Sequence, residues 1–205
     1  LQHVGDCGAR HHGMGAIVPY DGQRVERGLG LPPRIGHHCD GGIADLHHPE
    51  YWDVSFAHGA TREAYVANLK LAADWAAPLG IDILIEPINT RDMPDYFQSR
   101  TADARSVIAD VGAPNLALQF DLYHRHVMEG GVAEAIEEYK GLTRHYQCAS
   151  PPDRGEPDRG ELDYRDLFRR IDATGYTGWI GCEYKPRSTT LAGLGWPQRL
   201  GVSLG

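Results

Sequence analysis

Four residues with oxygen-donor side chains each stand at the carboxyl end of a short, largely apolar segment. They are Glu86, Asp121, Gln147 and Glu183, and the segments that they close read IDILIE, LALQFD, TRHYQ and GWIGCE. In a β/α barrel the carboxyl ends of the parallel strands meet at one mouth, where the following side chains converge. Three carboxylates and one amide at such a mouth form an oxygen-donor site suited to Mg²⁺ or Mn²⁺.

The two outer donors suggest proton transfer. Glu86 and Glu183 follow the first and the last of the four strands, so the curvature of a barrel places them across part of the mouth. A divalent cation that binds a carbonyl oxygen and a neighbouring hydroxyl acidifies the hydrogen on the carbon between them. One carboxylate can remove that proton and the other can return it one carbon away, through an ene-diolate. This pattern favours an aldose–ketose isomerisation or an epimerisation.

A single acidic residue at a strand end is more often a helix cap or a solvated charge. Four donors at the spacing of β/α units are harder to explain in that way. Further polar residues follow the same strand ends: Asn89 and Asp92 could shape the mouth, and His124 could hydrogen-bond a substrate oxygen. Arg154 could hold a substrate carboxylate as a bidentate fork, and Lys185 could do so as a point charge.

The elements that must position these residues follow from periodicity. Helices are predicted from Thr61 to about Leu79, from Thr101 to Gly112, from Val132 to Tyr139 and from Tyr164 to Ala173. Thr61 and Thr101 are expected to cap the first two, and Gly80, Gly112 and Gly141 to follow the ends of the first three. The segment 81–85 is apolar nearly throughout, as a strand covered on both faces should be. Strands alternating with helices predict a parallel α/β architecture, a TIM (β/α) barrel.

Composition limits the classes of partner. The net charge of −8 argues against nucleic acid and anionic membranes but not against a small anionic substrate, because a bound cation can invert the local field. No apolar run approaches the roughly 20 residues of a membrane span, and no signal peptide opens the chain. The four cysteines lack C-x-x-C spacing and are interpreted as free thiols in a reducing cytoplasm. We therefore expect a cytoplasmic protein.

The chain divides into two unequal parts. Residues 1–58 hold eight of the eleven histidines, are rich in Gly, Arg and Pro, and show little periodicity. These histidines lack the spacing of a defined zinc site, so an irregular segment is the preferred interpretation over a dedicated metal site. Residues 59–205 carry the four regular β/α units and all four donors. The chain of 205 residues is short for a complete barrel, which usually needs about 250.

Several longer motifs are specific enough to indicate a family. They are IEPINTRDMP (85–94), QFDLYH (119–124), MEG (128–130), RGEP (154–157), GELDY (160–164) and GYTGWIGCEYKP (175–186). Together they resemble the hydroxypyruvate isomerase family within the xylose-isomerase-like barrels, over roughly residues 61–196. The resemblance implies interconversion of hydroxypyruvate and tartronate semialdehyde with a divalent metal and no organic cofactor.

The resemblance also implies roles for individual residues. The metal ligands of the family fall on Glu86, Asp121, Gln147 and Glu183, its acid–base pair on Glu86 and Glu183, its substrate-contacting histidine on His124 and a nearby arginine on Arg154. Isomerisation or epimerisation of another small sugar acid, such as a 2-oxo-tetronate, and a non-catalytic barrel remnant are the alternatives.

Two departures from the family bear on the site. In the loop after Gln147 the family commonly has a glycine where this chain has Asp158, which puts the shape of the loop in question. Residues 1–58 are also too few for four further β/α units at about 30 residues each. An open half-barrel exposes sheet edges. Four explanations for the missing half are open. A partner chain such as a second copy covers the edges, or residues 1–58 form a substitute wall. Otherwise the protein has low stability, or the reading frame is damaged.

Overall fold

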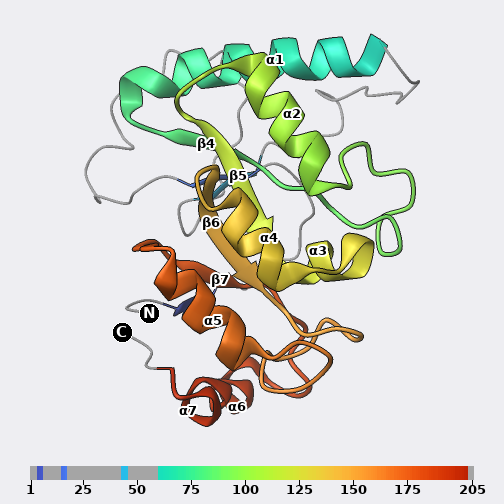
Figure 1. Cartoon of the computed structure of the whole chain (residues 1–205), viewed down its shortest axis with the longest axis vertical. Coiled ribbons are helices and arrows are strands. Elements are labelled where there is room, and N and C mark those ends of the chain that lie inside the picture. Colours follow the sequence, from blue (N-terminus) through green and yellow to red (C-terminus); the bar gives the residue numbers. More distant parts are fainter. Residues whose placement is uncertain (1–3, 7–14, 18–42, 46–59, 203–205) are drawn as a thin grey trace.

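The computed structural model of the chain describes residues 4–6, 15–17, 43–45 and 60–202, which form a sheet flanked by helices (Figure 1). Among them, seven strands form one sheet in the order β1-β7-β6-β5-β4-β2-β3. The strands are β1 (Val4–Asp6), β2 (Gly15–Ile17), β3 (Ile43–Asp45), β4 (Asp82–Ile85), β5 (Leu116–Asp121), β6 (Thr143–Cys148) and β7 (Ile180–Cys182). Strands β4 to β7 are parallel neighbours and β1 is parallel to β7, whereas β2 is antiparallel to both β3 and β4.

Helices separate the parallel strands along the chain. They are α1 (Ala60–Ala76) with a 3₁₀ turn η1 (Ala77–Leu79), α2 (Thr101–Val111), α3 (Leu122–Glu129), α4 (Val132–Tyr139), α5 (Tyr164–Ala173), α6 (Thr190–Gly193) and α7 (Trp196–Leu200). Helices α2, α4 and α5 follow one another along one face of the strands (Figure 1). This alternation confirms the predicted α/β class, with β4 to β7 as consecutive parallel strands of a barrel wall. Within the described residues, no helix is both long and apolar enough to cross a membrane.

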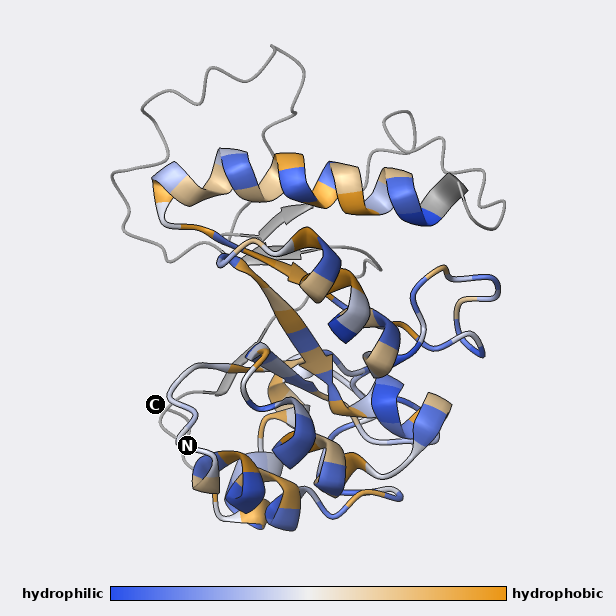
Figure 2. Cartoon of the chain, turned by 45° about the horizontal axis from the view of Figure 1, so that its top comes forward, coloured by the Kyte–Doolittle hydropathy of each residue, from blue (hydrophilic) through white to orange (hydrophobic). Residues whose placement is uncertain are grey.

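The two faces of β4 to β7 carry different residues, because successive side chains of a strand point to opposite faces. Residues that join the main hydrophobic cluster with the helices are Ile83, Ile85, Leu116, Leu118, Phe120, Tyr146, Cys148, Ile180 and Cys182. The alternate positions of the same strands hold the polar residues Gln119, Asp121, His145 and Gln147. Figure 2 shows the strands as predominantly hydrophobic and the helices as mixed. The polar residues therefore share the face of the sheet opposite the helix-packed core.

The glycines that end the first two helices were predicted correctly, whereas the two threonine caps were not. Gly80 and Gly112 adopt φ of 68° and 67°, the left-handed conformation that glycine permits at a helix end. The predicted Thr101 cap is wrong, because Arg100 occupies the N-cap and Thr101 is the first residue of α2. The Thr101 hydroxyl and N–H both donate to Glu129 Oε1 instead. Helix α1 likewise begins at Ala60, so Thr61 lies inside it.

Helix α4 provides a test of the core. Ile136 is fully buried in the main hydrophobic cluster. We expect Ile136→Ala to lower the free energy of unfolding by about 2–5 kcal/mol, since a buried Ile→Ala change loses both transfer free energy and packing. Glu137→Ala on the same helix is the matched control, because Glu137 pairs with Lys140 at the surface. Urea unfolding checks this, and equal midpoints for the two variants would contradict the packing of α4.

Candidate metal and acid–base site

A buried amide connects the donors of three neighbouring strands. Gln119, in the middle of β5, donates through Nε2 to Glu86 Oε2 at 2.9 Å and to Gln147 Oε1 at 2.8 Å. Gln147 also lies close enough to Glu183 to lower the pKa of that carboxyl. The structure therefore brings the donors at the ends of β4, β6 and β7 into one continuous network. Gln119 was not singled out from the sequence, although a lone amide in an otherwise apolar strand needs a buried partner.

Arg154 closes this network from the other side. Its Nη2 lies 3.1 Å from Glu183 Oε2 and 4.0 Å from Asp121 Oδ2. The side chain is nearly buried and lies over the Tyr123 ring, with Cζ 5.2 Å from the ring centroid. The backbone of Arg154 has φ of 57°, which costs a non-glycine residue about 1–2 kcal/mol. Arg154 O accepts from Lys185 N at 2.7 Å, so the loop after β6 is fastened to the end of β7.

Asp121 is both a predicted ligand and a helix cap. Its Oδ1 accepts from Tyr123 N at 2.7 Å and from His124 N at 3.3 Å, so Asp121 is the N-cap of α3. Helix α3 was not predicted, because it begins directly after β5 with no loop between them. The capping interpretation of a strand-end carboxylate is correct for Oδ1. It leaves Oδ2, which points into the network, for another partner.

Two oxygens of the site have no hydrogen-bond partner within the described residues. They are Glu86 Oε1 and Asp121 Oδ2, both fully shielded from solvent. A buried carboxylate oxygen without a partner is costly, and carboxylates that are buried are usually paired or bound to a metal. The oxygen donors at the ends of β4 to β7 include these two oxygens without partners. Such a donor set fits a hard divalent cation such as Mg²⁺ or Mn²⁺.

The electrostatics of the site also favour a cation. Burial raises the pKa of Glu86 well above its ordinary value, and the Glu183 and Asp121 carboxylates raise it further. Burial, and then the Asp121 charge, raise the pKa of Glu183 to about 7, while Arg154 and Gln147 oppose the shift. Three carboxylates face one guanidinium, so full ionisation leaves surplus negative charge. A divalent cation would remove that surplus and let the glutamates ionise.

His124 lies among the same carboxylates, and its hydrogen bonds decide how it can act. The Asn89 amide is oriented by its neighbours, since Oδ1 accepts from Arg91 N and Asp92 N and Nδ2 donates to Asp92 Oδ2. That places Asn89 Nδ2 as a donor 2.6 Å from His124 Nδ1, and Asn89 N donates to the same nitrogen at 3.3 Å. His124 Nδ1 is therefore an acceptor.

A neutral His124 that accepts at Nδ1 carries its proton on Nε2. Nε2 lies 3.8 Å from Glu86 Oε1 and 3.9 Å from Asp121 Oδ2, close enough for the three residues to resemble a metal triad. A ring nitrogen binds a metal through its lone pair. In this tautomer the lone pair is on Nδ1, where it accepts from Asn89, and Nε2 has none to offer. Arg154 Nη2, 3.3 Å from Nε2, can only donate, so both ring nitrogens face donors. The shorter Asn89 contact of 2.6 Å selects Nδ1 as the acceptor, and the N–H groups of Nε2 and Nη2 then both face the site. Two converging donors suit a substrate oxygen.

The remaining predicted residues lie at different distances from the site. Asp92 accepts from the Tyr123 hydroxyl at 2.8 Å, so it ties the loop after β4 to α3 as expected of a residue shaping the mouth. The Lys185 side chain is exposed and makes no hydrogen bond or ion pair with the part of the chain that the structure describes. Gly181 packs beneath Gln147, since a Cβ there would lie 2.9 Å from His145 Nε2 and 3.3 Å from Gln147 Cγ.

Asp158, which replaces the glycine common in the resembling family, is accommodated. Its Oδ1 accepts from Arg187 Nη2 at 2.9 Å and its Oδ2 from Arg199 Nε at 2.5 Å. Its backbone is not in the left-handed region, unlike that of Arg154 in the same loop. The substitution therefore fastens this loop to α7 and the segment before α6 without requiring a glycine conformation.

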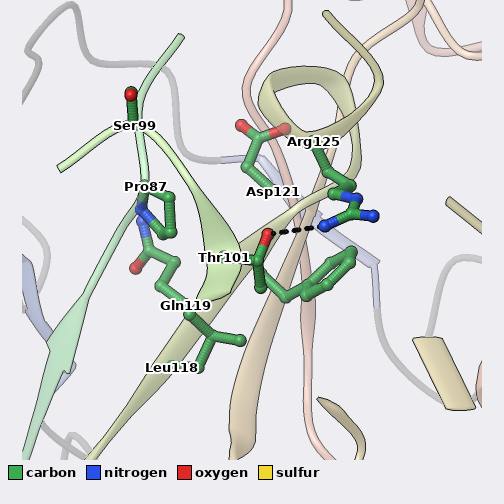
Figure 3. Close-up of a pocket in the computed structure, with 8 residues that line it drawn as sticks. Pro87, Ser99, Thr101, Leu118, Gln119, Asp121 and Arg125 are labelled. Carbon is green, nitrogen blue, oxygen red and sulfur yellow. Dashed lines mark hydrogen bonds between the residues drawn. The ribbon is translucent and has the colours of Figure 1, made fainter. Parts of the chain in front are cut away.

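A small pocket lies beside the network, lined in part by Gln119 and Asp121 (Figure 3). On its other side, Arg125 Nη1 donates to Thr101 Oγ1 at 3.4 Å and pairs with Glu129 Oε1 at 3.0 Å. Glu129 also accepts from Thr101 N. The hydrogen bonds of Thr101 with Arg125 and Glu129 therefore join the start of α2 to α3.

The tautomer of His124 can be tested directly. We expect Asn89→Asp to move the imidazole proton from Nε2 to Nδ1, because a carboxylate at position 89 accepts where the amide donated. Long-range ¹⁵N–¹H NMR of the metal-free chain distinguishes the two tautomers, and the His124 signal is identified by its absence in His124→Gln. Asp95→Asn in the same loop is the control and should leave the tautomer unchanged. A wild-type imidazole protonated on Nδ1 would refute the assignment.

The raised pKa of Glu183 predicts a pH-dependent stability. A carboxyl whose pKa is higher in the folded state contributes stability that is complete below the unfolded pKa of about 4.5 and is lost as pH rises through about 7. Metal-free Glu183→Gln should therefore become more stable relative to wild type between pH 5 and pH 8. Burial lowers the pKa of His145 to about 4, which has the opposite effect in both proteins and cancels in the comparison. Thermal unfolding measures this, with exposed Glu161→Gln as the control; parallel curves would contradict it.

The chain is similar to known proteins over most of its length. A family model described as xylose isomerase-like TIM barrel matches residues 34–200, which includes the last part of the segment 1–58. Hydroxypyruvate isomerase of Escherichia coli (strain K12) is 44% identical over 209 residues, covering 96% of this chain and 81% of that protein. The division at residue 58 stays a prediction, and the eight histidines before it lie outside the described residues.

Other relatives match about two thirds of the chain. The 2-oxo-tetronate isomerase of Cupriavidus necator is 52% identical over 135 residues, 66% of this chain and 52% of that protein. A solved structure described as AP endonuclease, family 2, from Brucella melitensis is 46% identical with a TM-score of 0.67, covering 68% of this chain and 54% of that one. The chain thus spans about half the length of these relatives.

Proposed function

Since the chain belongs to the hydroxypyruvate isomerase family of xylose isomerase-like TIM barrels, we propose that it interconverts hydroxypyruvate and tartronate semialdehyde (2-hydroxy-3-oxopropanoate). The proposed site holds one divalent cation, Mg²⁺ or Mn²⁺, between Glu86, Asp121, Gln147 and Glu183. The observation that carries the proposal is the pair of buried, unpartnered oxygens, Glu86 Oε1 and Asp121 Oδ2, inside one network of oxygen donors.

The proposed metal has one task. When bound, it polarises the substrate carbonyl and so acidifies the neighbouring C–H bond. The rest falls to side chains. Glu86 and Glu183, at opposite ends of the network, are the proposed proton carriers. Burial raises the pKa of both carboxyls above the ordinary value, that of Glu183 to about 7. Which of the two acts first is open.

The proton balance of the reaction fits two carboxylates. One glutamate removes a proton from C3 of hydroxypyruvate, and the electron pair forms the C2–C3 double bond of an ene-diolate. The other glutamate delivers a proton to C2. Meanwhile the C3 hydroxyl loses its proton to become the aldehyde and the former carbonyl oxygen on C2 gains one. His124 Nε2–H and Arg154 Nη2–H face this region as donors for the substrate oxygens.

Arg154 also supports an acidic substrate. Within the described chain it pairs with Glu183 at 3.1 Å and lies 4.0 Å from Asp121, so it can meet a substrate carboxylate once a metal offsets the charge of these groups. This argument does not fix the length of the substrate. Relatives of comparable identity are named hydroxypyruvate isomerase and 2-oxo-tetronate isomerase, so a four-carbon acid is the second candidate. The net charge of −8 disfavours the nucleic acid substrate suggested by the name of the Brucella protein.

Activity of the full chain tests the proposal. Metal-stripped protein given Mg²⁺ or Mn²⁺ and hydroxypyruvate in D₂O should form tartronate semialdehyde and incorporate deuterium on carbon, as followed by ¹H NMR. We expect Glu86→Gln and Glu183→Gln each to lower kcat/KM by about 10²–10⁴-fold, the usual range for losing a general acid or base. Glu161→Gln, at an exposed carboxylate, is the control and should retain full activity.

The outcomes separate the candidates. Equal rates for wild type and Glu183→Gln would reject an isomerase that uses this site. A higher kcat/KM for a 2-oxo-tetronate than for hydroxypyruvate would assign the longer acid. Stoichiometric Mn²⁺ binding without turnover of either acid would instead identify a non-catalytic member of the family.

A further inference from the structure

Two thiols that the proposed reaction does not use lie directly behind the site. Cys148 ends β6 and Cys182 ends β7, and the two residues are direct partners in the parallel register of these strands. Their Sγ atoms are 3.9 Å apart, and both side chains are buried on the helix-packed face of the sheet. They are the free cysteines of the described residues, because Cys7 and Cys39 lie outside them.

The backbone positions of the pair already suit a disulfide. Neighbouring strands lie about 4.7–4.9 Å apart, which falls within the Cα separation of about 4.4–6.8 Å that disulfides span. The sulfurs must approach from 3.9 Å to about 2.05 Å, a change that side-chain rotation and a small strand adjustment can supply. We propose that Cys148 and Cys182 form an oxidative modification site, which a peroxide converts into a disulfide between β6 and β7.

The chemistry balances with one peroxide molecule. The thiolate of one cysteine attacks a peroxide oxygen, which breaks the O–O bond, gives a sulfenic acid and releases hydroxide that is protonated to water. The second thiol then attacks the sulfenic sulfur, forms the S–S bond and expels a second water. Two thiols lose two electrons and two protons in total. Cys182 is the better first nucleophile, because it retains 8% exposure while Cys148 has none.

Burial sets the pace of this reaction. Both thiols are buried in the main hydrophobic cluster, so a peroxide reaches the sulfurs rarely. Oxidation should therefore be slow. The pair would respond to sustained exposure to a small oxidant and not to a large disulfide reagent, which cannot enter the core.

The position of the pair links its oxidation to the site, and this part depends on the proposed function. Cys148 directly follows Gln147, and Cys182 directly precedes Glu183. Glu183 N also donates to Cys148 O at 3.2 Å. Drawing the two strand ends together therefore changes the spacing of two proposed ligands that belong to one cation. We expect the disulfide to weaken binding of Mn²⁺ by about tenfold or more, comparable to losing a residue that orients a metal ligand.

Mass spectrometry tests the modification without reference to activity. The full chain carrying Cys7→Ser and Cys39→Ser is treated with hydrogen peroxide in its metal-free form and then denatured. Loss of two hydrogen atoms, reversal by dithiothreitol and a cross-linked peptide joining residues 148 and 182 are expected. Cys148→Ser or Cys182→Ser in the same background should form no intramolecular disulfide. Two intact thiols, or sulfinic and sulfonic acids without a cross-link, would overturn the proposal. Peptide mapping of wild type decides the matter if the background variant folds poorly.

Calorimetric titration with Mn²⁺ then separates the two claims. Weaker binding to the oxidised protein, restored by dithiothreitol, supports the link between the thiols and the site. Equal affinity of the oxidised and reduced proteins overturns that link but not the disulfide. Absence of Mn²⁺ binding in the reduced protein as well counts against the proposed function itself, while the mass measurement still decides whether the pair is oxidised.

Discussion

The constraint on which the site depends is the burial of three carboxylates around a single guanidinium. Removing each carboxylate from water carries a penalty of several kcal/mol unless charge or hydrogen bonds replace the lost hydration. Arg154 offsets part of this, since it approaches both Glu183 and Asp121. Glu86 and Asp121 each keep one oxygen without a hydrogen-bond partner, so Arg154 does not offset the whole desolvation penalty. The cluster therefore requires further positive charge to be stable in its ionised form.

The surrounding residues make sense as responses to that constraint. Gln119 supplies the amide hydrogen bond that Glu86 Oε2 requires, and the N-terminus of α3 supplies two N–H groups to Asp121. Asn89 donates to His124 Nδ1, so that the proton on Nε2 faces the carboxylates. Arg154 accepts a strained backbone in order to place its guanidinium there. Each contact therefore satisfies a site oxygen or keeps a nitrogen from becoming a ligand.

Features of the fold and the site could be predicted from the sequence where neighbouring residues determine them, and not where residues distant in the chain do. The strand ends and their four donors follow from period-2 and period-3.6 patterns, and the glycine helix ends follow from backbone conformation. The role of Thr101 could not be predicted, because its hydroxyl is claimed by Glu129, 28 residues away. Helix α3 was missed because Asp121 ends the strand and caps the helix at once, with no turn residues between. The contact between Asn89 and His124 could not be predicted either, because the two residues are 35 positions apart in the chain.

The arrangement of strands divides the proposed chemistry from the choice of substrate. All four candidate ligands, which include the two proposed proton carriers, lie at the ends of consecutive parallel strands, β4 to β7, whose register fixes the spacing of the donors. A parallel register places the carboxyl ends at one edge, so this half of a barrel wall holds the complete donor set. The four candidate ligands do not contact the part of a substrate beyond its reacting carbons, so they do not select its length. That selection requires a surface facing the donors across the mouth, and next to β4 the sheet continues through β2, which is antiparallel. Substrate length can therefore change through that surface while the proton-transfer machinery stays the same.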